Sequence, residues 1–273
     1  MTKSPTRDAQ GDQRPRILWT PDDMVSSAGP EVVELAATAG LFLDEWQDYF
    51  LYWALAERPG AAGRWAANDV GLMVARQNGK GSILEAVELA DLFLLDTEMT
   101  IHSAHLFETS KEAQERLLTL IESTPDLDKF MSANGGKVWR ASGQEGIELR
   151  REGRKRRLKF KTRTKGGGRG LSGDRVIIDE AMYYTADQDQ ALRPVLSARA
   201  NSQMWLTGSA GDKDSTAFGR MRQIALAGSN PRLLWMEWSI DGCSEFCPRD
   251  CEEHDRPDAV ESYAKANPGL GIR

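Results

Sequence analysis

The chain has 273 residues, of which 40% are hydrophobic, and its formal net charge is −6. This length permits one large domain, or one domain with an appendage, and the apolar content suffices for a core. No segment approaches the ~18 continuous apolar residues of a membrane helix, and the polar start (residues 1–16) lacks the apolar region of a signal peptide. All three cysteines follow residue 242, which excludes a disulfide framework for the main body. We expect a cytoplasmic, soluble protein from a reducing compartment.

Predicted strands and helices alternate along most of the chain. Residues 1–24 are polar and predict a flexible tail, and apolar side chains at helical spacing predict helix over residues 31–58. Strands are predicted at 71–75, 100–104, 176–178, 204–207 and 233–238, and helices at 82–95, 109–123, 187–199 and 215–227. This alternation predicts an α/β fold, a mostly parallel sheet with helices on both faces, over residues 25–238. Residues 239–273 are expected to be a linker or the start of a linker subdomain.

The octapeptide at residues 75–82, Ala-Arg-Gln-Asn-Gly-Lys-Gly-Ser, is typical of an altered phosphate-binding loop. Small residues at a strand-to-helix turn present backbone N–H groups to a polyphosphate, and Lys80 could reach its terminal phosphates. The common pattern has glycine where this chain has Val74, and a hydroxyl where it has Gly81. Ser82 supplies that hydroxyl one position late. A loop with one such glycine also arises by chance, so the loop alone does not decide the function.

A pair of carboxylates, Asp179 and Glu180, directly follows the apolar segment 176–178. Open α/β sheets bind their ligands at this end of their strands. Asp179 would hold magnesium through its water shell, and Glu180 would orient or deprotonate the attacking water. Solvated acids at a strand end would explain the pair by itself, but not its combination with the phosphate loop. Together the two motifs predict an ATPase.

The segment 150–165 carries ten Lys or Arg residues against one acid, Glu152. Apolar residues alternate with these charges, which predicts a β-hairpin with one buried and one strongly basic face. An ordinary solvated face mixes both signs, so we favour contact with phosphates of DNA or with an acidic neighbour. The candidate contact residues are Arg154, Lys155, Arg156, Arg157, Lys159 and Lys161.

Cys243, Cys247, Cys251 and His254 form a C-x3-C-x3-C-x2-H pattern that contains every cysteine of the chain. Four such ligands could hold a structural zinc ion. The spacing differs from the usual paired C-x2-C, and Pro248 disfavours one regular helix across the pattern. The interpretation favoured here is therefore thiols in a polar linker, with zinc as the alternative.

The motifs, in this order, resemble the N-terminal ATPase domain of the large terminase subunits of tailed bacteriophages. The most specific matches are segments 75–80, 168–181 and 266–271, and the resemblance runs from about Leu41 to the end. That family replaces the first loop glycine and places an arginine early in the loop, so Val74 and Arg76 agree with it, whereas Gly81 does not. The resemblance implies a P-loop fold of the RecA-like type with an additional strand and a catalytic glutamate, here with an inserted basic hairpin.

The resemblance also implies a motor that hydrolyses ATP with Mg²⁺ to drive double-stranded DNA into a procapsid. The implied partners are DNA, a portal protein, a small terminase subunit and further copies of the chain in a ring, although the isolated domain could be monomeric. The implied location is the host cytoplasm at the procapsid, not the mature virion or a membrane. Family members carry a nuclease domain after the ATPase. This chain stops before one could fit, so we expect no DNA cleavage.

Residue roles follow from the chemistry and the resemblance together. Lys80 and Arg76 would contact the β- and γ-phosphates, and Ser82 would complete the magnesium shell that Gly81 cannot. The loop donors would be Gln77, Asn78, Gly79, Lys80 and Gly81. The resemblance assigns γ-phosphate coupling to Thr207, Gly208 and Ser209.

Two further assignments have open alternatives. Trp46 and Gln47 match the family's adenine-reading segment, but Trp46 could equally belong to the core. Arg169, in a glycine-rich loop, would act in trans as an arginine finger, or the loop could simply bind DNA.

Two other functions compete with the terminase prediction. A superfamily 2 helicase also pairs a phosphate loop with Asp-Glu, but it needs a second RecA-like domain that the residues after 239 cannot supply. A nucleotide-binding scaffold would bind ATP through the altered loop and turn it over poorly.

Overall fold

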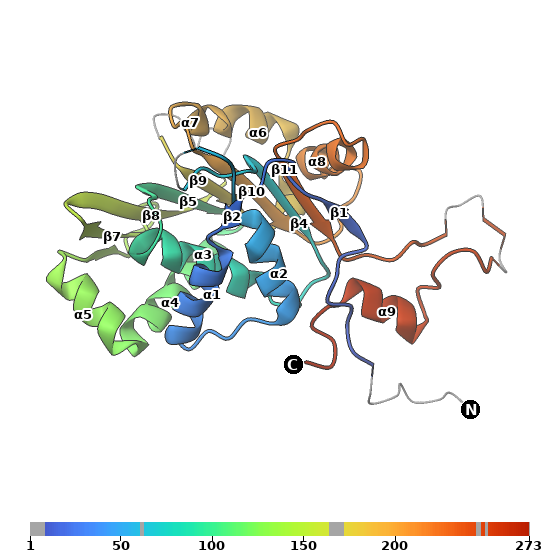
Figure 1. The fold of residues 1–273 in the computed structure, drawn as a ribbon, viewed down its shortest axis with the longest axis horizontal. Helices are drawn as coiled ribbons and strands as arrows, with labels where there is room; N and C mark the ends of the chain where they lie inside the picture. The colour runs from blue at the N-terminus through green and yellow to red at the C-terminus, as the bar shows by residue number, and fades with distance from the viewer. Residues whose placement is uncertain (1–8, 61–62, 164–171, 244–246, 249–250, 273) are drawn as a thin grey trace.

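The computed structural model describes residues 9–60, 63–163, 172–243, 247–248 and 251–272 (Figure 1). Its strands are β1 (Ile17–Trp19), β2 (Ser26–Ser27), β3 (Ala56–Glu57), β4 (Asp69–Met73), β5 (Met99–Ala104), β6 (Lys137–Trp139), β7 (Gly146–Arg151), β8 (Arg154–Thr162), β9 (Arg175–Ile178), β10 (Gln203–Gly208) and β11 (Leu233–Glu237). Its helices are α1 (Gly29–Thr38), α2 (Glu45–Ala54), α3 (Lys80–Phe93), α4 (Phe107–Ser123), α5 (Pro125–Ala133), the 3-10 helix η1 (Ala181–Tyr183), α6 (Ala186–Leu192), α7 (Pro194–Ser197), α8 (Thr216–Leu226) and α9 (Val260–Ala266).

Nine of the described strands form one sheet, in the order β1-β11-β4-β10-β9-β5-β8-β7-β6. The six strands from β11 to β8 pair in parallel, and antiparallel pairs occur at the two edges. Every residue of β9, β10 and β11 is buried, as expected for parallel strands that are covered on both faces. The predicted mostly parallel α/β sheet is therefore confirmed.

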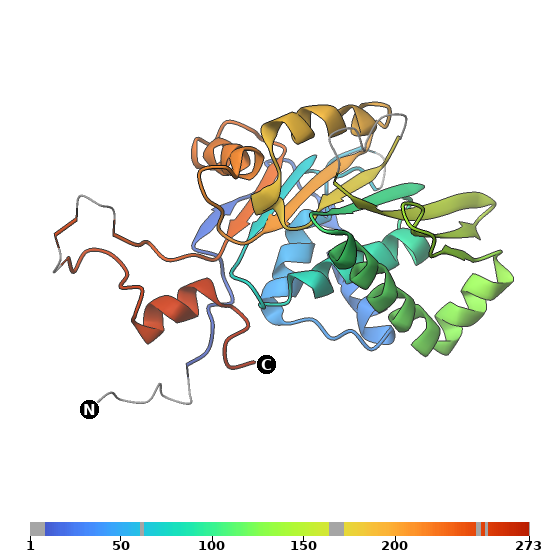
Figure 2. The ribbon, with the colours of Figure 1, turned by 180° about the vertical axis from the view of Figure 1, so that it is seen from behind.

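Helices cover both faces of the sheet (Figures 1 and 2). On one face, α1, α2 and α3 pack over the central strands, where Phe50 meets Trp205 edge to face. On the other face, α7 and α8 pack with η1, and Phe218 contacts Trp235. A third cluster joins α3, α4 and α5 to the hairpin strands β7 and β8. These layers hold the sheet rigid beneath the ends of its strands.

Several boundaries differ from the prediction for local reasons. The helix expected over 31–58 is two helices, because Gly40 reverses the chain at φ 79° and the side chain of Asp44 caps α2. The helix expected over 187–199 is divided, since Pro194 begins a separate short helix, α7. The first 24 residues were expected to be a tail, but β1 pairs antiparallel with β11 and completes that edge of the sheet. Pairing with β11 satisfies backbone N–H and C=O groups of β1, which is why this part of the N-terminal segment forms a strand.

The chain after β11 packs against the N-terminal segment near residues 11 and 12. Between β11 and α9, the described residues of 239–259 form an isolated bridge between Gly242 and Asp255 and no strand or helix. Figure 1 shows α9 beside the N-terminal segment. The Gly11 N–H donates to the Leu270 carbonyl at 2.9 Å, and the Asp12 N–H to that of Ala264 at 3.1 Å. No helix in the described parts of the chain is long and apolar enough to cross a membrane.

Candidate nucleotide site

The predicted phosphate loop connects β4 to α3. Gly79 is the N-cap residue of α3 at φ 89°, a left-handed conformation that lets the chain turn sharply from strand to helix. Gln77 also has a positive φ, 61°. Because α3 begins at Lys80, the N–H groups of its first turn lack helical partners and the helix dipole favours an anion there. The turn therefore has the backbone geometry that a phosphate group requires.

Lys80 lies beneath the loop. Its Nζ donates to the carbonyl oxygens of Val74 at 3.1 Å and Ala75 at 3.0 Å, and to Ser209 Oγ at 3.3 Å. Burial lowers the pKa of Lys80 to about 8, although the nearby carboxylate of Asp179 partly opposes this effect. The ammonium group is thus poorly solvated, and an incoming phosphate would stabilise its charged form.

The two carboxylates and the phosphate loop all follow the carboxyl ends of parallel strands. They lie near one another because only β10 separates the loop strand β4 from the acid-bearing strand β9. Asp179 Oδ1 accepts hydrogen bonds from Thr207 Oγ1 at 3.3 Å and from the Glu180 N–H at 2.8 Å. Glu180 has a left-handed backbone at φ 51°, and its Oε2 is buried without a hydrogen-bond partner among the described residues. Strained backbone and an unpaired buried acceptor are features of ligand and water sites.

The predicted coupling segment joins the two halves of the site. The Gly208 carbonyl accepts the Val74 N–H at 3.1 Å at the start of the loop. A β carbon on Gly208 would approach the N–H groups of Ala181 and Met182 to 3.2 Å, so β10 passes close to η1 at this point. Thr207 contacts Asp179, and Ser209 contacts Lys80. This strand end therefore touches both the lysine and the acids.

The oxygen donors at the site fit a hard cation such as Mg²⁺. Asp179 provides a carboxylate, and Ser82 lies in the first turn of α3, where its N–H donates to the Gly79 carbonyl at 3.2 Å. A β carbon on Gly81 would lie 3.3 Å from Nη2 of Arg116, whose Nε pairs with Glu85 at 2.6 Å. This ion pair covers the side on which the usual hydroxyl residue would project, which leaves Ser82 as the hydroxyl of this turn.

Two arginines lie at the site. Arg76 is exposed, and its Nη2 donates to the Tyr183 hydroxyl at 3.1 Å. The ring of Tyr183 stacks on that of His105. Arg163 was not predicted as a site residue. Its Nη2 donates to the Glu180 carbonyl at 3.2 Å, its Nε and Nη1 are buried without partners among the described residues, and burial lowers its pKa to about 10. Only its position at the end of the basic segment signalled it in the sequence.

Trp46 and Gln47 are both fully buried. Trp46 packs edge to face on Trp238 and belongs to the core, which was the alternative to the adenine role. The Gln47 amide accepts the Asp44 N–H at 2.7 Å and donates to the Gly79 carbonyl at 2.8 Å. The amide is fully buried, so an adenine could reach it only if the residues that cover it moved. In this structure Gln47 supports the phosphate loop through the Gly79 carbonyl, and its contact with a base stays a prediction.

Asn78 makes contacts that the sequence did not predict. It is buried, and its side-chain amide donates to Asn267 Oδ1 at 3.0 Å and accepts the Gly269 N–H at 3.0 Å. The N-terminal segment joins this contact, since Gln13 Nε2 donates to the Pro268 carbonyl at 2.8 Å and Gln13 Oε1 accepts the Trp46 N–H at 3.2 Å. The segments near residues 13 and 268 therefore meet beside the phosphate loop.

The basic hairpin extends the main sheet, because β8 pairs in parallel with β5 as well as antiparallel with β7. Arg156 does not lie on the basic face: it is fully buried and its Nη2 bonds Asp96 Oδ1 at 2.7 Å. The period of two along a strand places it in phase with Leu158 and Phe160, which corrects its predicted role in DNA or subunit contact. Arg154 and Lys155 are exposed and pair with Asp96 and Glu148.

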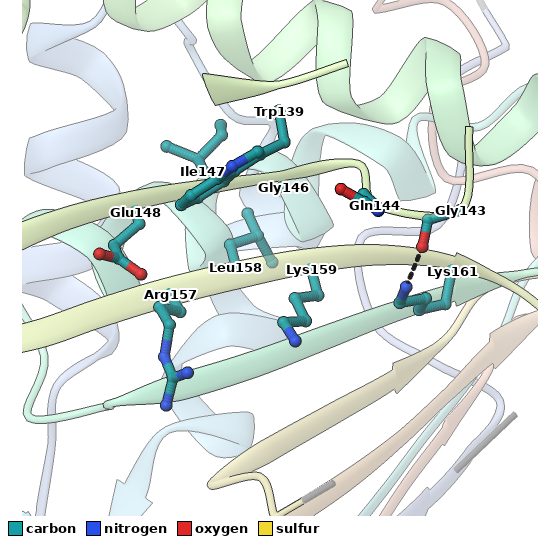
Figure 3. Close-up of a pocket in the computed structure, with 10 residues that line it drawn as sticks. All are labelled: Trp139, Gly143, Gln144, Gly146, Ile147, Glu148, Arg157, Leu158, Lys159 and Lys161. Atoms are coloured by element: carbon teal, nitrogen blue, oxygen red, sulfur yellow. Dashed lines mark hydrogen bonds between the residues drawn. The ribbon is translucent and has the colours of Figure 1, made fainter. Parts of the chain in front are cut away.

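Arg157, Lys159 and Lys161 of β8 line a groove of about 300 Å³ beside Trp139 (Figure 3). Arg157, Lys159 and Lys161 project into it, and Lys161 donates to the Gly143 carbonyl. Burial, with Lys161 and Arg157 nearby, lowers the pKa of Lys159. An aromatic ring among three cations is a surface that nucleic acid can contact.

Two other predicted groups lie elsewhere. Arg169 falls within residues 164–171, outside the described residues. The Cys/His set lies in the connection between β11 and α9, apart from the elements that bear the phosphate loop and the acids.

Comparison with solved structures identifies the large terminase of bacteriophage HK97, with a TM-score of 0.67 and 17% sequence identity, over 90% of this chain and 48% of that chain. The chain has the fold of a phage large terminase. It spans about half the length of the HK97 large terminase. The ATPase domain of the large terminase from Thermus phage P74-26 also matches, with a TM-score of 0.46 and 17% identity, over 66% of this chain and 73% of that chain. No family model and no curated protein matches the sequence.

Proposed function

We propose that this chain, which has the terminase fold, is an ATPase that powers translocation of double-stranded DNA into a procapsid. The observation that carries the proposal is the meeting, at the carboxyl ends of the strands, of a lysine-bearing phosphate loop with Asp179 and with a buried Glu180 oxygen that has no hydrogen-bond partner in the part of the chain that the structure describes. Phosphoryl transfer to water needs positioning and charge stabilisation more than covalent chemistry. The site offers both.

Each side chain has a definite task in this proposal. Lys80 would give up its hydrogen bonds to the loop carbonyls and bind the β- and γ-phosphates instead. The exposed Arg76 would contact the γ-phosphate from the solvent side of the site. Glu180 would accept a hydrogen bond from the attacking water and orient it. Asp179 and Ser82 would hold magnesium, which when bound neutralises charge on the phosphates. Thr207, bonded to Asp179, would sense the change in charge after hydrolysis.

The alternative function is a scaffold that binds nucleotide and hydrolyses it poorly. Two features favour that alternative: Lys80 is bonded to loop carbonyls, and Gly81 lacks the usual hydroxyl. Steady-state ATP hydrolysis distinguishes the two functions. We expect Lys80→Ala and Glu180→Gln each to lower turnover by at least about 10²-fold, with Glu180→Gln still binding nucleotide. Glu112→Gln, an exposed acid on α4, is the matched control and should leave turnover unchanged. Nucleotide binding without turnover in the unaltered chain, at high concentration and with DNA, would support the scaffold instead.

DNA, a portal protein, a small terminase subunit and a ring of identical chains are the partners that this function requires. The groove with Arg157, Lys159 and Lys161 is the proposed contact for DNA phosphates or for an acidic neighbour. Arg169 is proposed to complete the site of the next subunit. An arginine finger contributes about 10³ to 10⁵ in rate, so Arg169→Ala should abolish DNA-stimulated turnover of the assembled ring. Turnover that stayed unchanged in the ring would reject this role.

A further inference from the structure

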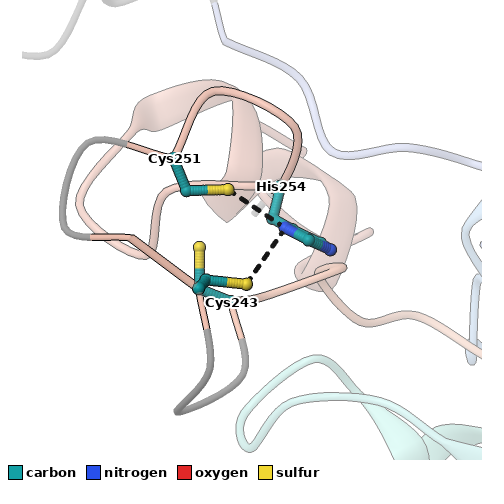
Figure 4. Close-up of side chains that lie close together, drawn as sticks. Cys243, Cys251 and His254 are labelled. Atoms are coloured by element: carbon teal, nitrogen blue, oxygen red, sulfur yellow. Dashed lines mark hydrogen bonds between the residues drawn. The ribbon is translucent and has the colours of Figure 1, made fainter.

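The potential ligand atoms of Cys243, Cys247, Cys251 and His254 gather at one point of the connection between β11 and α9. Figure 4 shows the side chains of Cys243, Cys251 and His254 close together. Their potential ligand atoms all lie within 4.8 Å of one another. His254 Nδ1 is 3.6 Å from Cys247 Sγ and 3.2 Å from Cys251 Sγ. Tetrahedral zinc with Zn–S of about 2.3 Å and Zn–N of about 2.0 Å separates its ligand atoms by about 3.5 to 3.8 Å. The observed spacing is close to that of a formed site.

The surrounding segment offers no other reason for this convergence. Among its described residues, none from 239 to 259 is a buried hydrophobic, so no apolar core gathers the three thiols. The Asp255 N–H donates to the Asp241 carbonyl at 2.8 Å, and Lys265 pairs with Asp255 at 2.5 Å, but these contacts do not involve the thiols. A polar connection of this length whose described residues form no strand or helix is otherwise expected to be disordered. Metal coordination supplies folding free energy in such segments.

We propose that Cys243, Cys247, Cys251 and the Nδ1 atom of His254 form a structural zinc site. Three thiolates and one imidazole are soft and borderline ligands, which select zinc over magnesium or calcium. Four protein ligands close the coordination sphere, which is the arrangement of structural rather than catalytic zinc. Pro248, which disfavoured one regular helix across the pattern, is compatible with this arrangement, because the described residues between Cys243 and His254 are not helical and the Pro248 carbonyl accepts the Cys251 N–H at 3.1 Å.

The position of the site gives it a role. The zinc-bound loop precedes α9, and α9 leads directly to Asn267 and Gly269, which bond Asn78 in the phosphate loop. Zinc would fix the length and direction of the connection and thereby hold α9 in place beside the N-terminal segment. Loss of zinc would release this segment while the sheet and its helices stay folded, because the three hydrophobic clusters lie outside it.

Metal content of the full chain, purified without added zinc and without a histidine tag, tests the proposal independently of ATP hydrolysis. We expect about one equivalent of zinc by mass spectrometry, falling below about a tenth in Cys251→Ser and His254→Ala. Cys243→Ser should have the same effect, and because Cys243 is exposed this change disturbs no packing. Glu252→Gln, an exposed neighbour, should retain the metal. Less than about a tenth of an equivalent in the unaltered chain, or zinc that persists in all three variants, would overturn the site.

Two further measurements report the geometry and the role. Cobalt added to chelator-stripped protein should give the visible absorption of a tetrahedral thiolate site, and Cys251→Ser should lose it. Limited proteolysis of stripped protein should cut between residues 239 and 259, with protection restored by zinc and not by magnesium. Proteolysis that was indifferent to zinc would reject the structural role.

Discussion

At the scale of single residues, burial destabilises the ammonium form of Lys80 relative to a solvated lysine. Its Nζ bonds two loop carbonyls and Ser209, and burial lowers its pKa from 10.5 to about 8. In the window between those values the folded chain binds fewer protons than the unfolded chain. Lys80 therefore destabilises the fold fully below pH 8, and this cost is relieved as the pH rises toward 10.5.

Nucleotide binding should consequently be coupled to proton uptake by Lys80. Phosphates favour the charged lysine, so at pH 9 binding of ADP with magnesium should take up close to one proton, and affinity should fall above pH 8. Calorimetry in two buffers of different ionisation enthalpy measures this uptake. Lys80→Met should lose it, whereas Lys111→Met, an exposed lysine on α4, should keep it. Equal uptake in the chain with and without Lys80 would contradict this assignment.

At the scale of elements, the strands of the basic hairpin divide their charges between two faces. Arg157, Lys159 and Lys161 face the groove, whereas Arg156 shares the opposite face with Leu158 and is fully buried. Two nitrogens of Arg156 lack hydrogen-bond partners among the described residues, and its one bonded partner, Asp96, is 72% exposed. Arg156 therefore packs in the interior although it is charged, whereas Arg157 next to it faces the groove.

This division predicts different effects for adjacent arginines. Arg156→Ala should lower the free energy of unfolding by about 1–3 kcal/mol through lost packing, and Arg156→Met should recover most of it because it refills the volume without unpaired donors. Arg157→Ala should leave stability within about 0.5 kcal/mol and weaken DNA binding, with a smaller salt dependence. Urea unfolding and DNA binding at two salt concentrations measure these effects. Weaker DNA binding by Arg156→Met would show that its charge reaches the surface.

At the scale of the whole molecule, the two ends of the described chain meet at the phosphate loop. Gln13 contacts both Pro268 and Trp46, and Asn267 and Gly269 hold the side chain of Asn78. The conformation of the loop therefore depends on the segment after β11 as well as on α3. Any movement of that segment would therefore change the phosphate loop.

Asn267→Ala should weaken nucleotide binding without unfolding the domain. The loss of one net hydrogen bond, about 1 kcal/mol, corresponds to roughly a five-fold increase in Kd. Asn134→Ala is the matched control, because both side chains donate at 2.8 Å to the carbonyl four residues earlier at a helix end, and only Asn267 also reaches Asn78. Fluorescent-nucleotide titration measures both. Equal changes in the two variants would show that the effect is helix capping alone.

Much of the fold followed from local patterns. Mainly apolar segments at Val176–Ile178 and Leu233–Trp238 predicted strands, and helical spacing after Ser82 predicted α3. The burial of Arg156 follows from the phase of its strand, which the alternation with Leu158 and Phe160 already carried in the sequence. The contact of Gln47 with the Gly79 carbonyl depends instead on α2 lying below the phosphate loop, which neither composition nor spacing shows.

The sequence by itself determined the α/β alternation, the strand-to-helix turn with Gly79 and Lys80, and the acidic end of β9, since each rests on neighbours along the chain. Only the tertiary structure decided which distant groups share a site. It placed β10 between β4 and β9, Arg163 against Glu180, and Asn267 against Asn78. It also gathered Cys243, Cys247, Cys251 and His254, whose spacing alone favoured a linker. Strand order and loop closure set these contacts, because they bring together atoms that are far apart in the chain.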